Sequence, residues 1–157
     1  MIPAALAGLA ALLSVLLVRR RMVVVTVDGS SMVPTLRDGD VVLVRRRRPA
    51  DLSVGQVVVV ECPVPPAARP DWSWPDPDEP SERRAWMVKR LAALPGQEWP
   101  ASCTGRTGSL PDGTLAVLGD NAAASVDSRQ MGAIPVDRVL GVVVRRMSTG
   151  RHPVRSA

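Results

Sequence analysis

The sequence is short of three side-chain types, and each shortage limits what the chain can be. It has no phenylalanine or tyrosine and four tryptophans among 157 residues, so a core must use valine, leucine, alanine, isoleucine and methionine. Valine-rich runs favour strands. Its one histidine, His152, lies in a polar tail beside Arg151 and Pro153. A hydrolase that uses a Ser-His-Asp triad is therefore not expected.

Cysteine is almost as scarce. Cys62 and Cys103 permit one disulfide, which an extracytoplasmic location would allow. Neither cysteine has ligand-type spacing with His152, so we expect no metal site and no other cofactor. The sequence has no internal repeat, which excludes a solenoid. Its length leaves room for one domain.

Lysine is the rarest cation in the chain. Lysine and arginine together number 20, and Lys89 is the one lysine among them. Arginine stays protonated, whereas burial can lower the pKa of a lysine enough to free a neutral amine. Lys89 lies in the largely apolar segment 85–91, which would favour the neutral form. We interpret Lys89 as a candidate general base.

A general base needs a group to deprotonate, and Ser31, in the segment 29–36 (GSSMVPTL), is the candidate nucleophile. A serine hydroxyl is a weak nucleophile until a neighbouring base takes its proton. Ser-Lys pairs perform this chemistry without histidine. The two residues together predict acyl-transfer chemistry.

Three segments resemble the boxes of type I signal peptidases of the Ser-Lys dyad class. Those boxes read approximately S-M-x-P-T-L, K-R-x-x-G-x-P-G and G-D-N-x-x-x-S-x-D-S-R-x-x-G. Their counterparts in this chain, in the same order, are residues 31–36, 89–96 and 119–132. The resemblance spans residues 23 to 145 apart from a proline-rich middle. It implies cleavage of signal or leader peptides from exported precursor proteins, after small residues.

The resemblance also implies a role for each matched residue. Ser31 would attack the carbonyl and Lys89 would act as general base. Ser125 would orient the lysine amine, and Asp127 and Arg129 would form a supporting ion pair. The pocket beside the cleavage point would be lined by four apolar residues, Val27, Met32, Leu36 and Val88.

Substrate binding and oxyanion stabilisation follow from the same segments. Gly29 stands where some family members place a hydroxyl that donates to the oxyanion, so the main-chain N–H of Ser31 would be the chief donor here. An extended substrate would add as a strand beside residues 27–30 and 85–88.

The rest of the chain predicts a small, mainly antiparallel β domain over residues 22–145. Expected strands are residues 22–27, 41–44, 54–61, 86–94, 114–118 and 139–144. Prolines concentrate between residues 63 and 80, which predicts a loop insert at 63–83. Residues 146–157 are expected to form a mobile basic tail.

The N-terminal segment is expected to be one transmembrane helix. Residues 2–18 are apolar apart from Ser14, and as a helix they would extend about 26 Å, close to a hydrocarbon core. We expect an uncleaved anchor at residues 1–21. The alternative, a cleavable secretory signal, lacks a basic region before the apolar run, since the arginines at 19–21 follow it.

Two arguments about membrane orientation conflict. The positive-inside rule would leave residues 19–21, and with them the domain, on the cytoplasmic face. The resemblance implies the outer face of the cell membrane, where exported precursors emerge. We expect a single-pass protein with an extracytoplasmic domain, and the cytoplasm-facing arrangement is the alternative.

The net charge of +5 and the arginine run 45–48 raise the question of polyanionic partners. Clustered arginines bind phosphates, but no nucleic-acid recognition motif or stacking aromatic accompanies this run. We expect membrane lipid, and no nucleic acid, as the partner. Trp72 and Trp74 in the proline-rich insert would either enter the membrane interface or cover the domain's own apolar surface.

Two other interpretations of the chain stay open. A dedicated maturation protease of the same dyad class would serve one partner protein. An inactive β scaffold would instead bind lipid or protein through its arginines and tryptophans.

Overall fold

The computed structural model describes residues 21–64, 72–75 and 84–148, and within them seven strands form one antiparallel sheet. The order across the sheet is β1-β2-β7-β3-β4-β5-β6. The strands are β1 (Met22–Thr26), β2 (Val41–Arg45), β3 (Val57–Glu61), β4 (Trp86–Ala93), β5 (Thr114–Leu118), β6 (Ile134–Pro135) and β7 (Val139–Ser148). The helical segments are η1 (Pro49–Asp51), η3 (Ala122–Ala124), α2 (Ser128–Met131) and η4 (Val136–Arg138). The expectation of a mainly β, antiparallel domain is confirmed.

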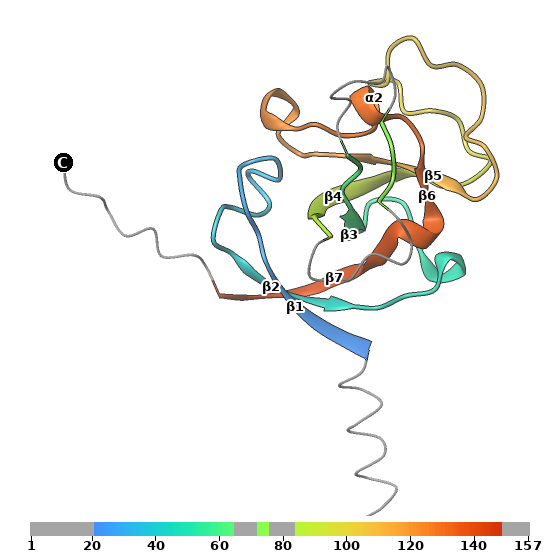
Figure 1. Ribbon diagram of the computed structural model, residues 1–157. Coiled ribbons are helices and arrows are strands. Elements are labelled where there is room, and N and C mark those ends of the chain that lie inside the picture. The colour runs from blue at the N-terminus through green and yellow to red at the C-terminus, as the bar shows by residue number, and fades with distance from the viewer. Residues whose placement is uncertain (1–20, 65–71, 76–83, 149–157) are drawn as a thin grey trace, which may run out of the picture.

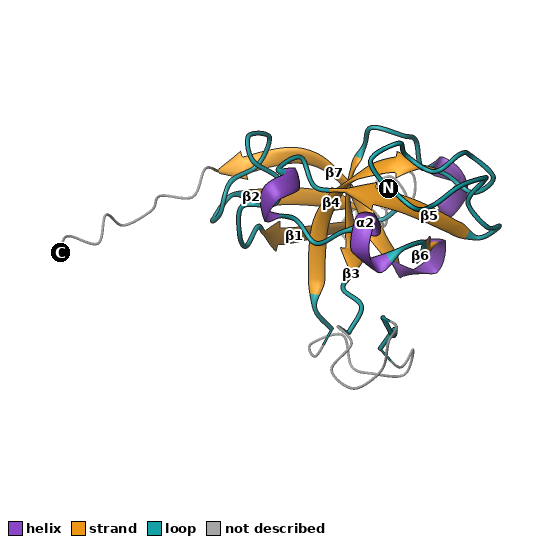
Figure 2. Cartoon of the chain, turned by 90° about the horizontal axis from the view of Figure 1, so that it is seen from above, coloured by secondary structure: helices purple, strands orange, loops and turns teal. Residues whose placement is uncertain are grey.

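The sheet curls, so its two ends do not lie in one plane. In Figure 1, β1, β2 and β7 lie together on one side, β5, β6 and α2 lie on the other, and β3 and β4 lie between them. Figure 2 shows the same arrangement from above, with α2 beside β5 and β6. Buried apolar side chains of the sheet and its loops form two clusters.

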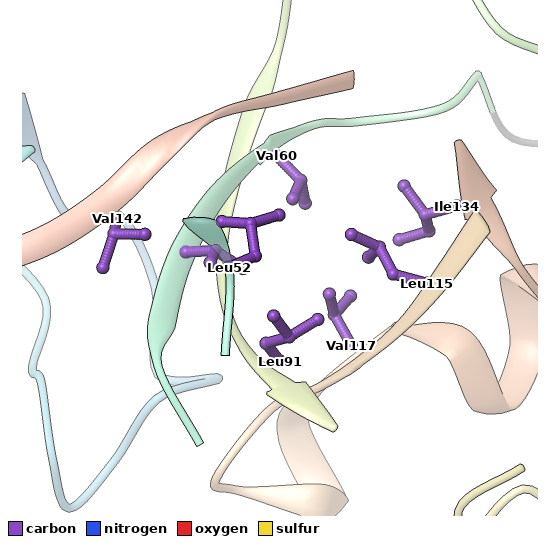
Figure 3. Packing of buried hydrophobic residues seen from close by; sticks show 8 residues of the cluster. Leu52, Val60, Leu91, Leu115, Val117, Ile134 and Val142 are labelled. Atoms are coloured by element: carbon purple, nitrogen blue, oxygen red, sulfur yellow. The ribbon is translucent and has the colours of Figure 1, made fainter. Parts of the chain in front are cut away.

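The two apolar clusters meet at β3. The first cluster, seen in Figure 3, contains Leu52, Val58, Val60, Leu91, Leu115, Val117, Ile134 and Val142. The second contains Val27, Met32, Leu36, Val42, Val44, Val59 and Val88. Successive side chains of a strand point to opposite faces. For this reason Val58 and Val60 enter the first cluster and Val59 enters the second.

Strand boundaries differ from the expectation by more than one residue at two places. β3 begins at Val57 rather than at residue 54, because the preceding residues form a turn in which Ser53 N donates to Gln56 Oε1 at 3.1 Å. β7 extends to Ser148, which pairs with Val41 of β2. The prediction that the tail begins at residue 146 is therefore wrong for residues 146–148. Residues 149–157 lie outside the described part of the chain.

The expected anchor, residues 1–21, lies outside the described residues except for Arg21. Among the helices of the described residues, none has the length and apolar character needed to cross a membrane.

A short described piece of the proline-rich insert is held against the domain. Ser73 forms an antiparallel bridge with Val64, and Trp74 packs against the first apolar cluster. Trp74 therefore covers the domain's own apolar surface, one of the two possibilities that the sequence left open. Trp72 is half-buried.

Glu61, at the end of β3, is a buried acid that connects three segments. Its side chain is 1% exposed and receives Arg138 Nη1 on Oε2 at 2.9 Å, while Arg84 Nε lies 3.6 Å from Oε1. Arg138 also donates to the carbonyl of Pro75 at 3.2 Å and lies over the ring of Trp74. One guanidinium thus connects β3, η4 and the insert.

We expect Arg138→Met to destabilise the domain by about 3 kcal/mol, because it leaves the buried carboxylate of Glu61 without its short hydrogen bond. Thermal unfolding in detergent measures the effect. The control is Arg145→Met at an exposed position of β7. Adding Glu61→Leu to Arg138→Met should restore part of the loss. Equal unfolding temperatures for Arg138→Met and Arg145→Met would contradict the role assigned to this ion pair.

Candidate active site

Ser31 lies on a turn that follows β1. The loop between β1 and β2 closes through Val27 N donating to Asp40 O at 2.8 Å and Gly39 N donating to Val27 O at 2.9 Å. Gly29 has φ +84°, a left-handed conformation that glycine adopts readily, and its N–H donates to Asp38 Oδ1 at 2.8 Å. These contacts fix the backbone that carries the serine.

Lys89 reaches this turn from the centre of the sheet. It lies on β4 opposite Val58 of β3, and it is 5% exposed. Its Nζ donates to Ser31 Oγ at 2.8 Å. The fold therefore brings together the two residues that the sequence singled out, although 58 positions separate them.

Burial changes the protonation of this lysine. Removal from water lowers the pKa of Lys89 below its ordinary value, and the nearby charge of Arg129 lowers it further. Asp127 and Cys62 oppose this effect without cancelling it. The amine thus loses its proton more readily than an exposed lysine does, which a general base requires.

Asp127 organises the loop beside the pair. Its carboxylate is fully buried and accepts from Gly119 N at 2.8 Å, from Ser125 Oγ at 2.7 Å and from Arg129 Nε at 2.8 Å. Burial alone would raise the pKa of Asp127, but the bonds from Arg129, Gly119 and Ser125 outweigh it and hold the pKa below its usual value. Asp127 also caps α2, where it forms a capping box with Gln130.

Ser125 is buried, and its hydroxyl donates to Asp127. Within the described residues no hydrogen bond joins Ser125 to Lys89, so its orienting role stays a prediction. A Cβ on Gly119 would lie 2.2 Å from Ser125 Oγ and 2.7 Å from the carbonyl oxygen of Ser31. The absence of a side chain at Gly119 thus permits the close approach of the two loops.

Asn121 joins these loops directly. Its main-chain N donates to the Ser31 carbonyl at 2.9 Å, and its Nδ2 donates to the Ser30 carbonyl at 3.2 Å. Within the described chain the N–H of Ser31 itself donates no hydrogen bond. That N–H is therefore available to an oxyanion.

Arg90 and Asp120 form an ion pair that was not predicted from the sequence, and we call it the clamp. Arg90 Nε and Nη2 donate to the two oxygens of Asp120, each at 2.7 Å, and Nη1 donates to the carbonyl of Gly55 at 2.7 Å. Asp120 also accepts from the hydroxyl of Thr35, and its hydrogen bonds with Arg90 lower its pKa. The signal was present, since Arg90 and Asp120 stand inside the second and third boxes.

The expected pocket residues lie together, and two of them, Met32 and Val88, adjoin Ser31 and Lys89 in the sequence. Val27, Met32, Leu36 and Val88 all belong to the second apolar cluster, and none is more than 8% exposed. Residues 86–89 of β4 pair with β3 alone within the described sheet, because β5 joins β4 from Arg90 onward. Their second edge can therefore accept a strand.

The described residues include both cysteines of the chain. Cys62 and Cys103 are both free thiols there. No group of three His, Cys, Asp or Glu side chains in the described ranges lies close enough to hold a metal ion. His152 lies outside these ranges.

Comparison with known proteins finds one family and relatives of moderate similarity. The family described as signal peptidase, peptidase S26, matches residues 2–102 and 100–148, which contain all three boxes. The mitochondrial ATP-independent inner membrane protease subunit 1a of Arabidopsis thaliana is 29% identical over 130 residues, or 77% of this chain and 67% of the relative. The mitochondrial inner membrane protease subunit 1 of Schizosaccharomyces pombe is 30% identical over 132 residues, or 80% and 73%.

We expect Asp127→Asn to lower stability at neutral pH by about 3 kcal/mol, because an amide cannot replace the buried carboxylate opposite Arg129. Since folding lowers the pKa of Asp127 below 3.8, its stabilisation is fully present above about pH 5 and is lost as the pH falls through the lowered pKa. The difference in unfolding temperature between wild type and Asp127→Asn should therefore become smaller at acidic pH. Unfolding temperatures between pH 2 and 7 test this, with exposed Asp112→Asn as control. A difference in unfolding temperature that does not change with pH would contradict the stabilising role of ionised Asp127.

Proposed function

The chain belongs to the signal peptidase S26 family, as its boxes suggested, and on that premise we propose that it is a serine endopeptidase using Ser31 and Lys89 as a catalytic dyad. The family and the two relatives support a peptidase that processes leader peptides. The finer proposal is that this chain removes signal or leader segments from exported precursors, after small residues.

The observation that carries this proposal is the 2.8 Å contact between Ser31 Oγ and the Nζ of Lys89, a side chain that is 5% exposed. A neutral Lys89 would take the hydroxyl proton as Ser31 Oγ attacks the scissile carbonyl. The oxyanion that forms would lie against the N–H of Ser31. Protonated Lys89 would then give the proton to the leaving amine, and a water activated by the same amine would hydrolyse the acyl-enzyme.

The supporting residues act through the dyad in this proposal. Asp127 and Arg129 hold the loop of Ser125 in place, and Ser125 would orient the amine of Lys89 during the reaction. The unpaired edge of β4 would receive the substrate as an added strand. Four apolar side chains, those of Val27, Met32, Leu36 and Val88, would then border a space suited to a small residue.

We also propose a membrane location. The relatives are named as inner membrane proteases, and residues 2–18 are apolar enough in sequence to serve as an anchor. The domain would lie on the outer face of the membrane, because exported precursors emerge on that face.

Single substitutions test the dyad. We expect Ser31→Ala, Lys89→Ala and Lys89→Arg each to reduce precursor cleavage by at least about 10³-fold, because each removes the nucleophile or the titratable base. Ser30→Ala, at the exposed neighbouring serine, should cleave normally. The assay uses the full chain in neutral detergent with two unrelated signal-bearing precursors. Activity in Lys89→Arg would reject the proposed base, and cleavage of one precursor alone would favour the dedicated maturation protease.

The rate should also depend on pH. The pKa of Lys89 is lowered from 10.5. We therefore expect kcat/KM to rise with pH as the amine becomes neutral, with a midpoint at a pH below 10.5. Asp127→Asn should move the midpoint to lower pH, since the charge of Asp127 raises the pKa of Lys89. Asp112→Asn should leave it unchanged. A midpoint near that of a free lysine would contradict the lowered pKa of Lys89, and a rate that does not change with pH would exclude the neutral amine as base.

A further inference from the structure

A basic groove lies at the start of β1, and the proposed reaction does not use it. Its volume is about 710 Å³, and it is lined by Arg21, Met22, Arg45, Arg46, Arg47, Arg48 and Asp51. Five of these side chains are guanidinium groups and one is a carboxylate. We call it the arginine groove.

The arginine groove is distinct from the active site. Met22 pairs with Arg45, and Arg46 N donates to the carbonyl of Arg21 at 2.8 Å, so the groove forms where β1 begins and β2 ends. Ser31 follows the opposite end of β1. The five residues of β1 separate the two sites by roughly 17 Å of extended chain.

Two of the lining arginines have unmet hydrogen-bonding capacity. Exposure alternates along residues 45–48, with Arg45 and Arg47 partly buried and Arg46 and Arg48 exposed. The Nε atoms of Arg45 and Arg47 are buried and have no hydrogen-bond partner within the described residues. A buried N–H without a partner is unfavourable, and phosphate oxygens are the acceptors that guanidinium groups bind best. Such a groove is therefore suited to a phosphate group.

The charge of the groove is not cancelled from within. Asp51 is the one acid in the lining, and it contacts Arg48 at 3.6 Å, while the side chain of Arg48 is 87% exposed. Exposed pairs of this kind contribute little. Four other arginines still face the same space.

We propose that the arginine groove binds the phosphodiester headgroup of an anionic phospholipid. The apolar segment 2–18 ends three positions before Arg21, so an anchor there would bring the groove to the level of the headgroups. This step rests on the membrane location in the proposed function. The lining contains no aromatic side chain on which a base could stack, which argues against nucleic acid.

The test titrates the full chain, in a neutral detergent, with dioctanoyl phosphatidylglycerol and counts bound lipid by native mass spectrometry. The comparison probes are dioctanoyl phosphatidylcholine, inorganic phosphate and a single-stranded oligonucleotide. We expect saturable binding of phosphatidylglycerol and at least about tenfold weaker binding of the zwitterionic lipid. Equal binding of both lipids, or of free phosphate alone, would overturn the headgroup assignment. Tighter, groove-dependent binding of the oligonucleotide would overturn the choice of lipid.

Matched double variants locate the site. Arg45→Gln with Arg47→Gln should weaken phosphatidylglycerol binding roughly tenfold or more. Arg37→Gln with Arg145→Gln removes the same charge from exposed positions outside the groove and should change binding less than about twofold. Equal losses in the two variants would show a diffuse charge effect and reject the site. Arg46→Gln, at an exposed lining position, gives a third variant should the first pair fail to fold.

The result is separable from that of the proposed peptidase. Cleavage of a soluble precursor in neutral detergent should be unchanged by Arg45→Gln with Arg47→Gln, because the groove and Ser31 lie at opposite ends of β1. If this double variant loses lipid binding and still cleaves the precursor normally, both the lipid site and the peptidase activity are supported. A wild-type chain that binds lipid without cleaving any precursor would leave the groove supported and the peptidase rejected.

Discussion

The site depends on keeping one lysine amine out of water and against one hydroxyl. An ammonium in a buried position is unfavourable unless it is paired, and within the described residues the hydrogen bond of Lys89 goes to Ser31, not to a carboxylate. Asp127 favours the protonated form of Lys89 through its charge, without a hydrogen bond to the amine. The fold therefore holds Lys89 in a position that favours loss of its proton, and the pairing of β4 with β3 maintains that position.

The loops that surround this pair are held by contacts between segments far apart in the sequence. Arg90, the residue after Lys89, binds Asp120, and Asp120 in turn accepts from Thr35 of the loop that carries Ser31. Asn121 then bonds to the carbonyl of Ser31. Three hydrogen-bonded contacts thus hold the segment of Lys89, the turn of Ser31 and the loop of Asp120 and Asn121 together. Displacing one of them would move the hydroxyl away from the amine.

The sequence predicted the class of the fold and the meeting of Ser31 with Lys89 better than it predicted the contacts that surround these two residues. Valine runs identify strands because β-branched residues pack well on a pleated surface, but the turn at Ser53 to Gln56 and the extension of β7 to Ser148 depend on contacts between distant residues. Lys89 was visible because its type is unique in the chain. Arg90 and Asp120 both stand inside matched boxes, but their pairing was not predicted, since one arginine among many carries no sign of its partner.

Arginine and lysine have different roles around the site, because the charge of arginine is permanent and that of a buried lysine can be lost. Arg90 and Arg129 bind Asp120 and Asp127 through planar groups whose charge is permanent, and the hydrogen bonds raise the pKa of each guanidinium further. Such pairs stabilise loops and cannot exchange a proton near neutral pH. Lys89 has the one cationic side chain in the described domain whose charge burial can remove. Because fixed charge and titratable charge sit on different residue types, the loops stay paired while the amine beside Ser31 changes its protonation.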